Sequence, residues 1–148
     1  MKKLTLFLMS LVAFTLVSCG SGYNEKTCDD LIYKYDEKGK LTTDDYAEAI
    51  RQYSAILDEV DSRLDKIEAL AESNDEEALD LWDGIEDETI AEQFNALDRI
   101  LGNAHSAGEI KGENKKAFKA LEKKINKIEK KGEKVEKKLR RLKRRLDD

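Results

Sequence analysis

The chain has 148 residues and a formal net charge of −5; 40% of its residues are charged, 7% are aromatic and none is proline. That length fits one domain, and the composition is typical of long amphipathic helices rather than of a thick globular core. Two cysteines and one histidine exclude a Cys/His metal cluster, and no G-x-S-x-G motif marks a nucleophile.

The first 18 residues have the layout of a secretory signal. Two lysines follow Met1, an apolar run extends from Leu4 to Val17, and small residues precede Cys19. The apolar run is shorter than the stretch of about 20 residues that a membrane-spanning helix needs. The sequence therefore predicts a signal peptide over residues 1–18.

The end of this segment, Leu16-Val17-Ser18-Cys19, resembles the lipobox of bacterial lipoproteins. The resemblance implies that the chain is cut before Cys19 and that the Cys19 thiol carries a diacylglycerol. Two or three acyl chains of the palmitate kind make such an anchor effectively permanent. Gly20, where an Asp would favour the inner membrane, favours the outer membrane if the host is Gram-negative. The resemblance thus implies a small lipid-anchored protein of the bacterial cell envelope.

Beyond the lipobox, we expect a polar tether over residues 19–26 and then a short helix. Thr27, with Asp30 in the following turn, predicts the N-cap of that helix, and its brief apolar face ends near Gly39. Cys28 is expected to be a small buried hydrophobic residue, and an intermolecular disulfide is the alternative.

The stretch YKYDEKGKLTTDDY, residues 33–46, has the glycine, aliphatic and acidic spacing of a calcium-binding loop. Two lysines stand where that loop needs acidic or amide ligands. We therefore expect no metal and no cofactor here and interpret the stretch as a hinge. Gly39 ends one helix, and Thr42 or Thr43 caps the next one.

The remaining chain has three apolar stripes. From Tyr46 to Ala71 the apolar residues recur at alternating spacings of four and three, which is a heptad pattern. A second stripe runs from Leu79 to Ala104, with a kink or break predicted between residues 84 and 89. A glycine-rich turn over residues 102–113 precedes the third stripe, from Phe118 to Leu146. Such regular spacing argues against disorder, which has a similar composition.

These stripes predict an all-α fold over residues 27–148. Short turns between helices of similar length favour an antiparallel, up-down-up bundle of three long helices, and we expect the short N-terminal helix to fold along its side. The last helix would then run parallel to the first long helix. Its carboxyl-terminal end would lie beside the end of that helix and the start of the next.

Charge is divided unevenly along the chain. Residues 28–110 hold 24 acidic and 7 basic residues, a net charge of −17, whereas residues 111–145 hold 17 basic and 5 acidic residues, a net charge of +12. In the predicted bundle the basic end of the last helix lies beside the acidic residues 72–88. The expected ion pairs would select the register more than they stabilise the fold.

These features predict a non-enzymatic structural or interaction module, because the carboxylates form no recognisable catalytic pair and no nucleophile stands out. Its expected partners are the membrane, other envelope proteins or anionic envelope polymers. The alternative is a binder of lipopolysaccharide or phospholipid headgroups. The residues that would bind are Lys137, Lys138, Arg140, Arg141, Arg144 and Arg145. Nucleic acid is not expected, since no aromatic residues are interleaved for base stacking.

Overall fold

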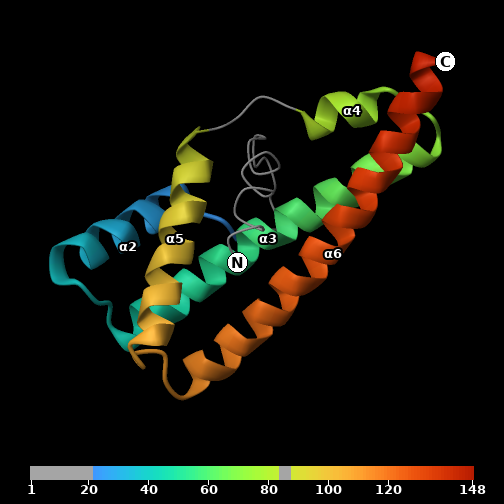
Figure 1. The fold of residues 1–148 in the computed structure, drawn as a ribbon. Helices are drawn as coiled ribbons and strands as arrows, with labels where there is room; N and C mark the ends of the chain where they lie inside the picture. Colours follow the sequence, from blue (N-terminus) through green and yellow to red (C-terminus); the bar gives the residue numbers. More distant parts are fainter. Residues whose placement is uncertain (1–21, 84–87) are drawn as a thin grey trace.

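The computed structural model describes residues 22–83 and 88–148, and this part of the chain is helical without any strand. The helices are α2 (Glu25–Lys38), α3 (Thr43–Glu72), α4 (Glu77–Trp82), α5 (Glu88–Ser106) and α6 (Glu113–Asp147) (Figure 1). The predicted all-α class is confirmed. Cys19 and the predicted signal peptide lie outside the described residues.

Helix α2 begins earlier than the sequence predicted. Its N-cap is Asn24, whose side-chain oxygen accepts a hydrogen bond of 2.9 Å from the backbone N–H of Thr27. Asn is among the most favourable N-cap residues, and the cap at Thr27 was therefore wrong by three positions. The start of α2 falls within residues 19–26, which the sequence assigned to a tether.

The hinge between α2 and α3 is confirmed. Gly39 has a φ of 73°, in the left-handed region that glycine adopts easily, and its N–H donates to the Tyr35 carbonyl at 2.7 Å. Thr42 is the N-cap of α3, and its hydroxyl accepts from the Asp45 N–H at 3.1 Å. The glycine and acid spacing of this stretch thus belongs to a helix stop followed by a capped start.

Helices α3 and α6 form the long axis of the molecule and run parallel to each other (Figure 1). The side-chain amide of Asn114 donates to the Thr43 carbonyl at one end of the pair, and Lys138 pairs with Glu72 at the other. The predicted α3 stripe is buried, and so is the α6 stripe except for its last residue, Leu146. The buried members on α6 are Phe118, Leu121, Ile125, Ile128, Gly132, Val135, Leu139 and Leu142. Burial of these side chains supplies most of the stability, at about 1.5–3 kcal/mol for each large one before the entropy cost.

The segment between the two long helices is divided. Helix α5 runs antiparallel to α3 and packs on its first half, where Tyr53 stacks on Phe94 with ring centroids 4.9 Å apart. Helix α2 packs beside α5, and α4 lies at the far end of α3 (Figure 1). The predicted bundle of three long helices is therefore not confirmed. The end of α4 at Trp82 and the start of α5 at Glu88 agree with the break predicted between residues 84 and 89.

The turn before α6 is shorter than predicted. Helix α5 continues through Gly102 to Ser106, because Leu101 and Ala104 are buried on its inner face. Gly108, with a φ of 71°, then ends the helix, and its N–H donates to the His105 carbonyl at 3.1 Å. The glycine content of residues 102–113 overstated the length of the turn.

Candidate functional site

A row of three lysines on α6 faces α3, and we call it the inner lysine row: Lys124, Lys131 and Lys138. Lys124 pairs with Asp58, Lys131 pairs with Asp61 at 2.7 Å and also with Asp65, and Lys138 pairs with Glu68 at 3.1 Å and Glu72 at 2.6 Å. The lysines recur every seven residues, which keeps them on one side of the apolar stripe. The row thus matches the acidic flank of α3 over most of the length of the pair.

The ammonium groups of Lys131 and Lys138 are held as cations. Burial lowers the pKa of Lys131, but hydrogen bonds to Asp61 and Asp65 outweigh it and the net shift is upward. Hydrogen bonds that Lys138 donates to Glu72 and Glu68 likewise raise the pKa of Lys138. A lysine in this state neither abstracts a proton nor acts as a nucleophile near neutral pH.

A second row, the outer lysine row, consists of Lys123, Lys130 and Lys137, which are all exposed. Each of them precedes a member of the inner row by one position. None of the three forms an ion pair with any carboxylate in the described part of the chain. The outer row and its neighbours make the solvent face of α6 strongly basic.

The six basic residues predicted to bind anions have different surroundings. Lys138 is paired with α3, and Arg140 pairs within α6 with Glu136 at 2.8 Å. Lys137, Arg141, Arg144 and Arg145 are exposed. Arg141 and Arg145 line a groove together with Ala71, Glu72 and Lys138.

The sequence predicted that the basic end of α6 lies beside the acidic residues 72–88. Among the carboxylates of that range that the structure describes, only Glu72 forms an ion pair with α6, through Lys138. Lys138 also pairs with Glu68, which lies before that range.

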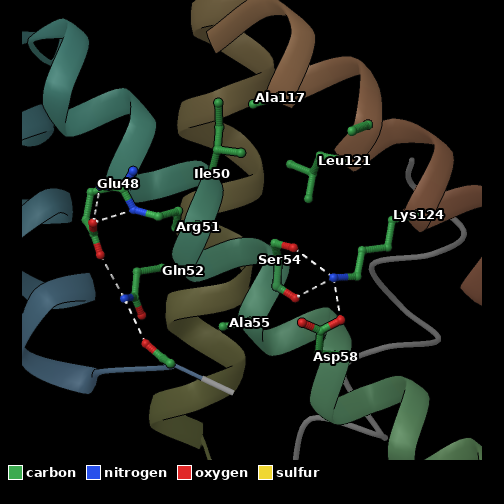
Figure 2. A pocket seen from close by; sticks show the side chains of 12 residues that line it. Glu48, Ile50, Arg51, Gln52, Ser54, Ala55, Asp58, Ala117, Leu121 and Lys124 are labelled. Atoms are coloured by element: carbon green, nitrogen blue, oxygen red, sulfur yellow. Dashed lines mark hydrogen bonds and ion pairs between the residues drawn. The ribbon is translucent and has the colours of Figure 1, made fainter. Parts of the chain in front are cut away.

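A groove with a volume of about 580 Å³ lies between the first halves of α3 and α6 (Figure 2). Its lining includes Ile50, Ala55, Ala117 and Leu121. On its rim the Lys124 ammonium donates to the Ser54 hydroxyl at 2.8 Å and to the Ser54 carbonyl at 3.2 Å, in addition to pairing with Asp58.

An ammonium group has three donors, so the donors of Lys124 are used within the protein.

The opposite rim of this groove is also internally bonded. The Gln52 amide donates to Glu48 at 3.0 Å and to the Gly22 carbonyl at 3.2 Å, and Arg51 pairs with Glu48 (Figure 2). The hydrogen bond from Gln52 is the largest influence on Glu48, and with Arg51 it holds the pKa of Glu48 below its usual range against the effect of burial. The rim therefore stabilises the helix ends that form it and presents no activated acid or base.

Two buried glutamines hold the start of the described chain, and the sequence did not reveal them. Gln52 accepts a hydrogen bond of 2.8 Å from the Asn24 N–H, while Gln93 donates to the Glu25 carbonyl at 3.0 Å and accepts from the Tyr23 hydroxyl. We call Gln52 and Gln93 the glutamine pair. Each glutamine directly precedes a core aromatic residue, Tyr53 or Phe94, and this is the feature of the sequence that could have indicated that they are buried.

Cys28 is fully buried as a free thiol, in agreement with the interpretation as a small core residue. Burial is the largest influence on it, followed by the charge of Asp29, and together with other carboxylates they raise the pKa of Cys28 to about 12. A protonated, enclosed thiol is unreactive. An intermolecular disulfide would require this part of the core to open.

Two further observations concern residues 22–83 and 88–148. No cluster of His, Cys, Asp and Glu there has the arrangement of a metal site. Within the same residues, no helix combines the length and the apolar character needed to cross a bilayer.

Comparison with protein-family models, curated proteins and solved structures finds no match for this chain. The features that bear on function are the basic face of α6, the groove beside Gly22 and the resemblance of residues 16–19 to a lipobox.

Proposed function

We propose that this chain is a lipid-anchored protein of the bacterial cell envelope that acts as a non-enzymatic structural or interaction module. The observation that carries the proposal is the four-residue match to a lipobox at Leu16 to Cys19, placed directly after an apolar signal. The first helix in the described part of the chain begins at Glu25, six positions after Cys19.

The surface of the helical pair supports an interaction role over a catalytic one. The inner lysine row, the groove rim and Cys28 are engaged within the protein. The solvent face of α6, in contrast, exposes lysines and arginines that have no ion pair with any carboxylate in residues 22–83 and 88–148, such as Lys130 and Arg141. A rigid rod with a strongly charged face is suited to contact large charged surfaces.

Metabolic labelling with an alkyne analogue of palmitate tests the anchor. We expect the protein in the membrane fraction to carry the label. Its mass should be that of residues 19–148 with the attached lipid. Cys19→Ser should abolish the label and leave the uncleaved precursor, whereas Cys28→Ala, the matched control, should keep it. Continued labelling of Cys19→Ser would refute the proposal.

The second candidate function is binding of anionic headgroups through the end of α6. It is favoured by the exposure of Lys137, Arg141, Arg144 and Arg145 without an ion pair to any described carboxylate. We expect the mature chain without its lipid to sediment with phosphatidylglycerol vesicles at low salt and less at high salt, because salt screens exposed charges.

Arg141→Glu with Arg145→Glu should weaken this sedimentation. Lys26→Glu with Lys38→Glu, which makes the same change of charge on α2, should affect it less. A mature chain that stays in solution at low salt would remove this candidate.

A further inference from the structure

The point at which the chain enters the described structure is fixed on one flank of α3. The Gly22 carbonyl and the Asn24 N–H both bond to the side chain of Gln52, at 3.2 and 2.8 Å. Cys19 lies three positions before Gly22, and an extended chain of that length spans at most about 10 Å. A lipid on Cys19 therefore holds the bilayer surface close to Gly22.

Two surfaces adjoin Gly22, and either could face the bilayer. The first is the start of α2, where a shallow hollow is lined by Asn24, Glu25, Lys26 and Asp29. The second is the groove between α3 and α6, which Gly22 itself lines. Helices α2 and α6, which carry the two surfaces, lie on different sides of α3 (Figure 1).

Charge distinguishes the two surfaces. The α2 surface has two carboxylates against one lysine, and anionic headgroups would repel it. On the groove side, α6 exposes Lys116, Lys123 and Lys127. Each of these lies three or four positions from the groove residues Ala120 or Lys124, so they border the groove on one helix face.

The carboxylates near the groove are largely neutralised. Glu48 is paired with Arg51, Asp58 is paired with Lys124, and Glu113 lies 3.5 Å from Lys116. Lys123 and Lys127 have no ion pair with the carboxylates that the structure describes. The groove face thus has a net positive charge beside the anchor point.

We propose that the groove face of α3 and α6 lies on the surface of the bilayer that holds the anchor, with Lys116, Lys123 and Lys127 against anionic phospholipid headgroups. The proposal rests on the proposed anchoring at Cys19. Attraction between exposed charges fades over about 8 Å at physiological ionic strength. The short connection from Cys19 to Gly22, which lines the groove, keeps the groove face close to the bilayer, which a long tether would not do.

This orientation assigns a role to the rest of the molecule. Helices α2 and α5 pack against each other and on α3. Helix α2 has five acidic and three basic residues, and α5 has three acidic residues and one basic residue. With the groove face on the bilayer, the weakly acidic surface of α2 faces away from the membrane.

Lysine footprinting tests the docking face. The mature chain, residues 19–148, is coupled through the Cys19 thiol to a maleimide lipid in phosphatidylglycerol vesicles or in neutral phosphatidylcholine vesicles. Cys28 does not compete, because burial raises its pKa to about 12. Exposed lysines are then acetylated and read by mass spectrometry. We expect Lys116, Lys123 and Lys127 to lose acetylation on the anionic vesicles, and the control lysines Lys26 and Lys38 on α2 to keep it.

Insertion of a flexible Gly/Ser segment of about 20 residues between Ser21 and Gly22 should restore acetylation of the three lysines, since its average span of roughly 25 Å exceeds the range of the attraction. Protection of Lys26 in place of the three lysines would overturn the proposal, and so would equal protection on the neutral vesicles. The lipid is supplied chemically, so this result is independent of whether Cys19 is acylated in the cell, which the labelling experiment decides.

Discussion

The inner and outer lysine rows of α6 are made of neighbouring residues in the sequence and have opposite environments in the structure. Lys131 keeps 27% of its side chain exposed and pairs with Asp61 and Asp65, whereas Lys130 is exposed and has no ion pair with any described carboxylate. Consecutive residues on a helix are about 100° apart, which is enough to turn one lysine towards α3 and the other towards solvent. Lysines of the inner row therefore help to fix the register between α3 and α6, whereas lysines of the outer row are available for an external partner.

The strongest test of this comparison removes the packing that both rows depend on. Ile128→Ala takes away a buried side chain of the α6 stripe, and we expect a loss of roughly 2–5 kcal/mol in the free energy of unfolding. Urea unfolding followed by circular dichroism measures it. The control is Leu146→Ala, at the exposed end of the same stripe, which should change stability little because 46% of Leu146 is already exposed.

Charge reversal compares the two rows directly. Lys131→Glu converts two ion pairs, each worth roughly 0.2–1 kcal/mol, into repulsions, and we expect a loss of about 1–2 kcal/mol in unfolding free energy. Lys130→Glu should have a clearly smaller effect, since its neighbours Lys127 and Lys134 are of opposite sign to the new carboxylate. Equal effects in urea unfolding would mean that the inner row does not contribute to the α3–α6 interface.

Alkaline pH should weaken the interfaces in which Lys131 and Tyr46 take part. Burial is the largest influence on Tyr46, followed by its hydrogen bond to Glu109, and they raise the pKa of Tyr46 to about 12. A group whose pKa is raised by folding contributes stability below its unfolded pKa, near 10 for Tyr and 10.4 for Lys. That contribution is lost as the pH rises through the folded pKa.

Thermal unfolding measured from pH 9 to pH 12 checks this expectation. We expect a steady fall in Tm above about pH 10, and a shallower fall for Tyr46→Phe, which cannot ionise. A fall of the same steepness in Tyr46→Phe would mean that other groups account for the alkaline instability.

Salt should give the smallest effect. Screening at high ionic strength weakens exposed ion pairs, so the difference in stability between Lys131→Glu and Lys130→Glu should narrow in 1 M NaCl, where the Debye length is about 3 Å. Parallel urea titrations at low and high salt measure the change. A difference that is independent of salt would indicate that packing of the lysine side chain, and not its charge, distinguishes the two rows.

Local signals in the sequence predicted most helix boundaries. Gly39 was identified as a stop, and Thr42 or Thr43 as a start, because the left-handed backbone and the hydroxyl cap are properties of single residues. The structure selects Thr42. The start of α2 was misplaced, because Asn24 and Thr27 are both acceptable caps and the choice depends on Gln52 holding the Asn24 backbone. The length of α5 was underestimated, because burial of Leu101 and Ala104 extends the helix past Gly102.

The candidate surface was predicted only in part. A basic end of α6 followed from counting charges, and pairing of Lys138 with Glu72 followed from the path of the chain. The partners of Lys124 and Lys131 on α3 and the glutamine pair could not be deduced, because they depend on how α6 is rotated about its own axis and on which residues α5 brings to α2.

By itself, the sequence determined the helical class, the heptad stripes, the hinge at Gly39 and the lipobox prediction, since each depends on residues close together in the chain. Only the tertiary structure decided that α3 and α6 form the long pair and that Gly22 is held beside the groove. It also decided that the inner lysine row pairs with α3, whereas the outer lysine row has no ion pair with any carboxylate that the structure describes. These features join residues about 70 positions apart, such as Lys131 with Asp61, and their geometry arises from packing that no local pattern specifies.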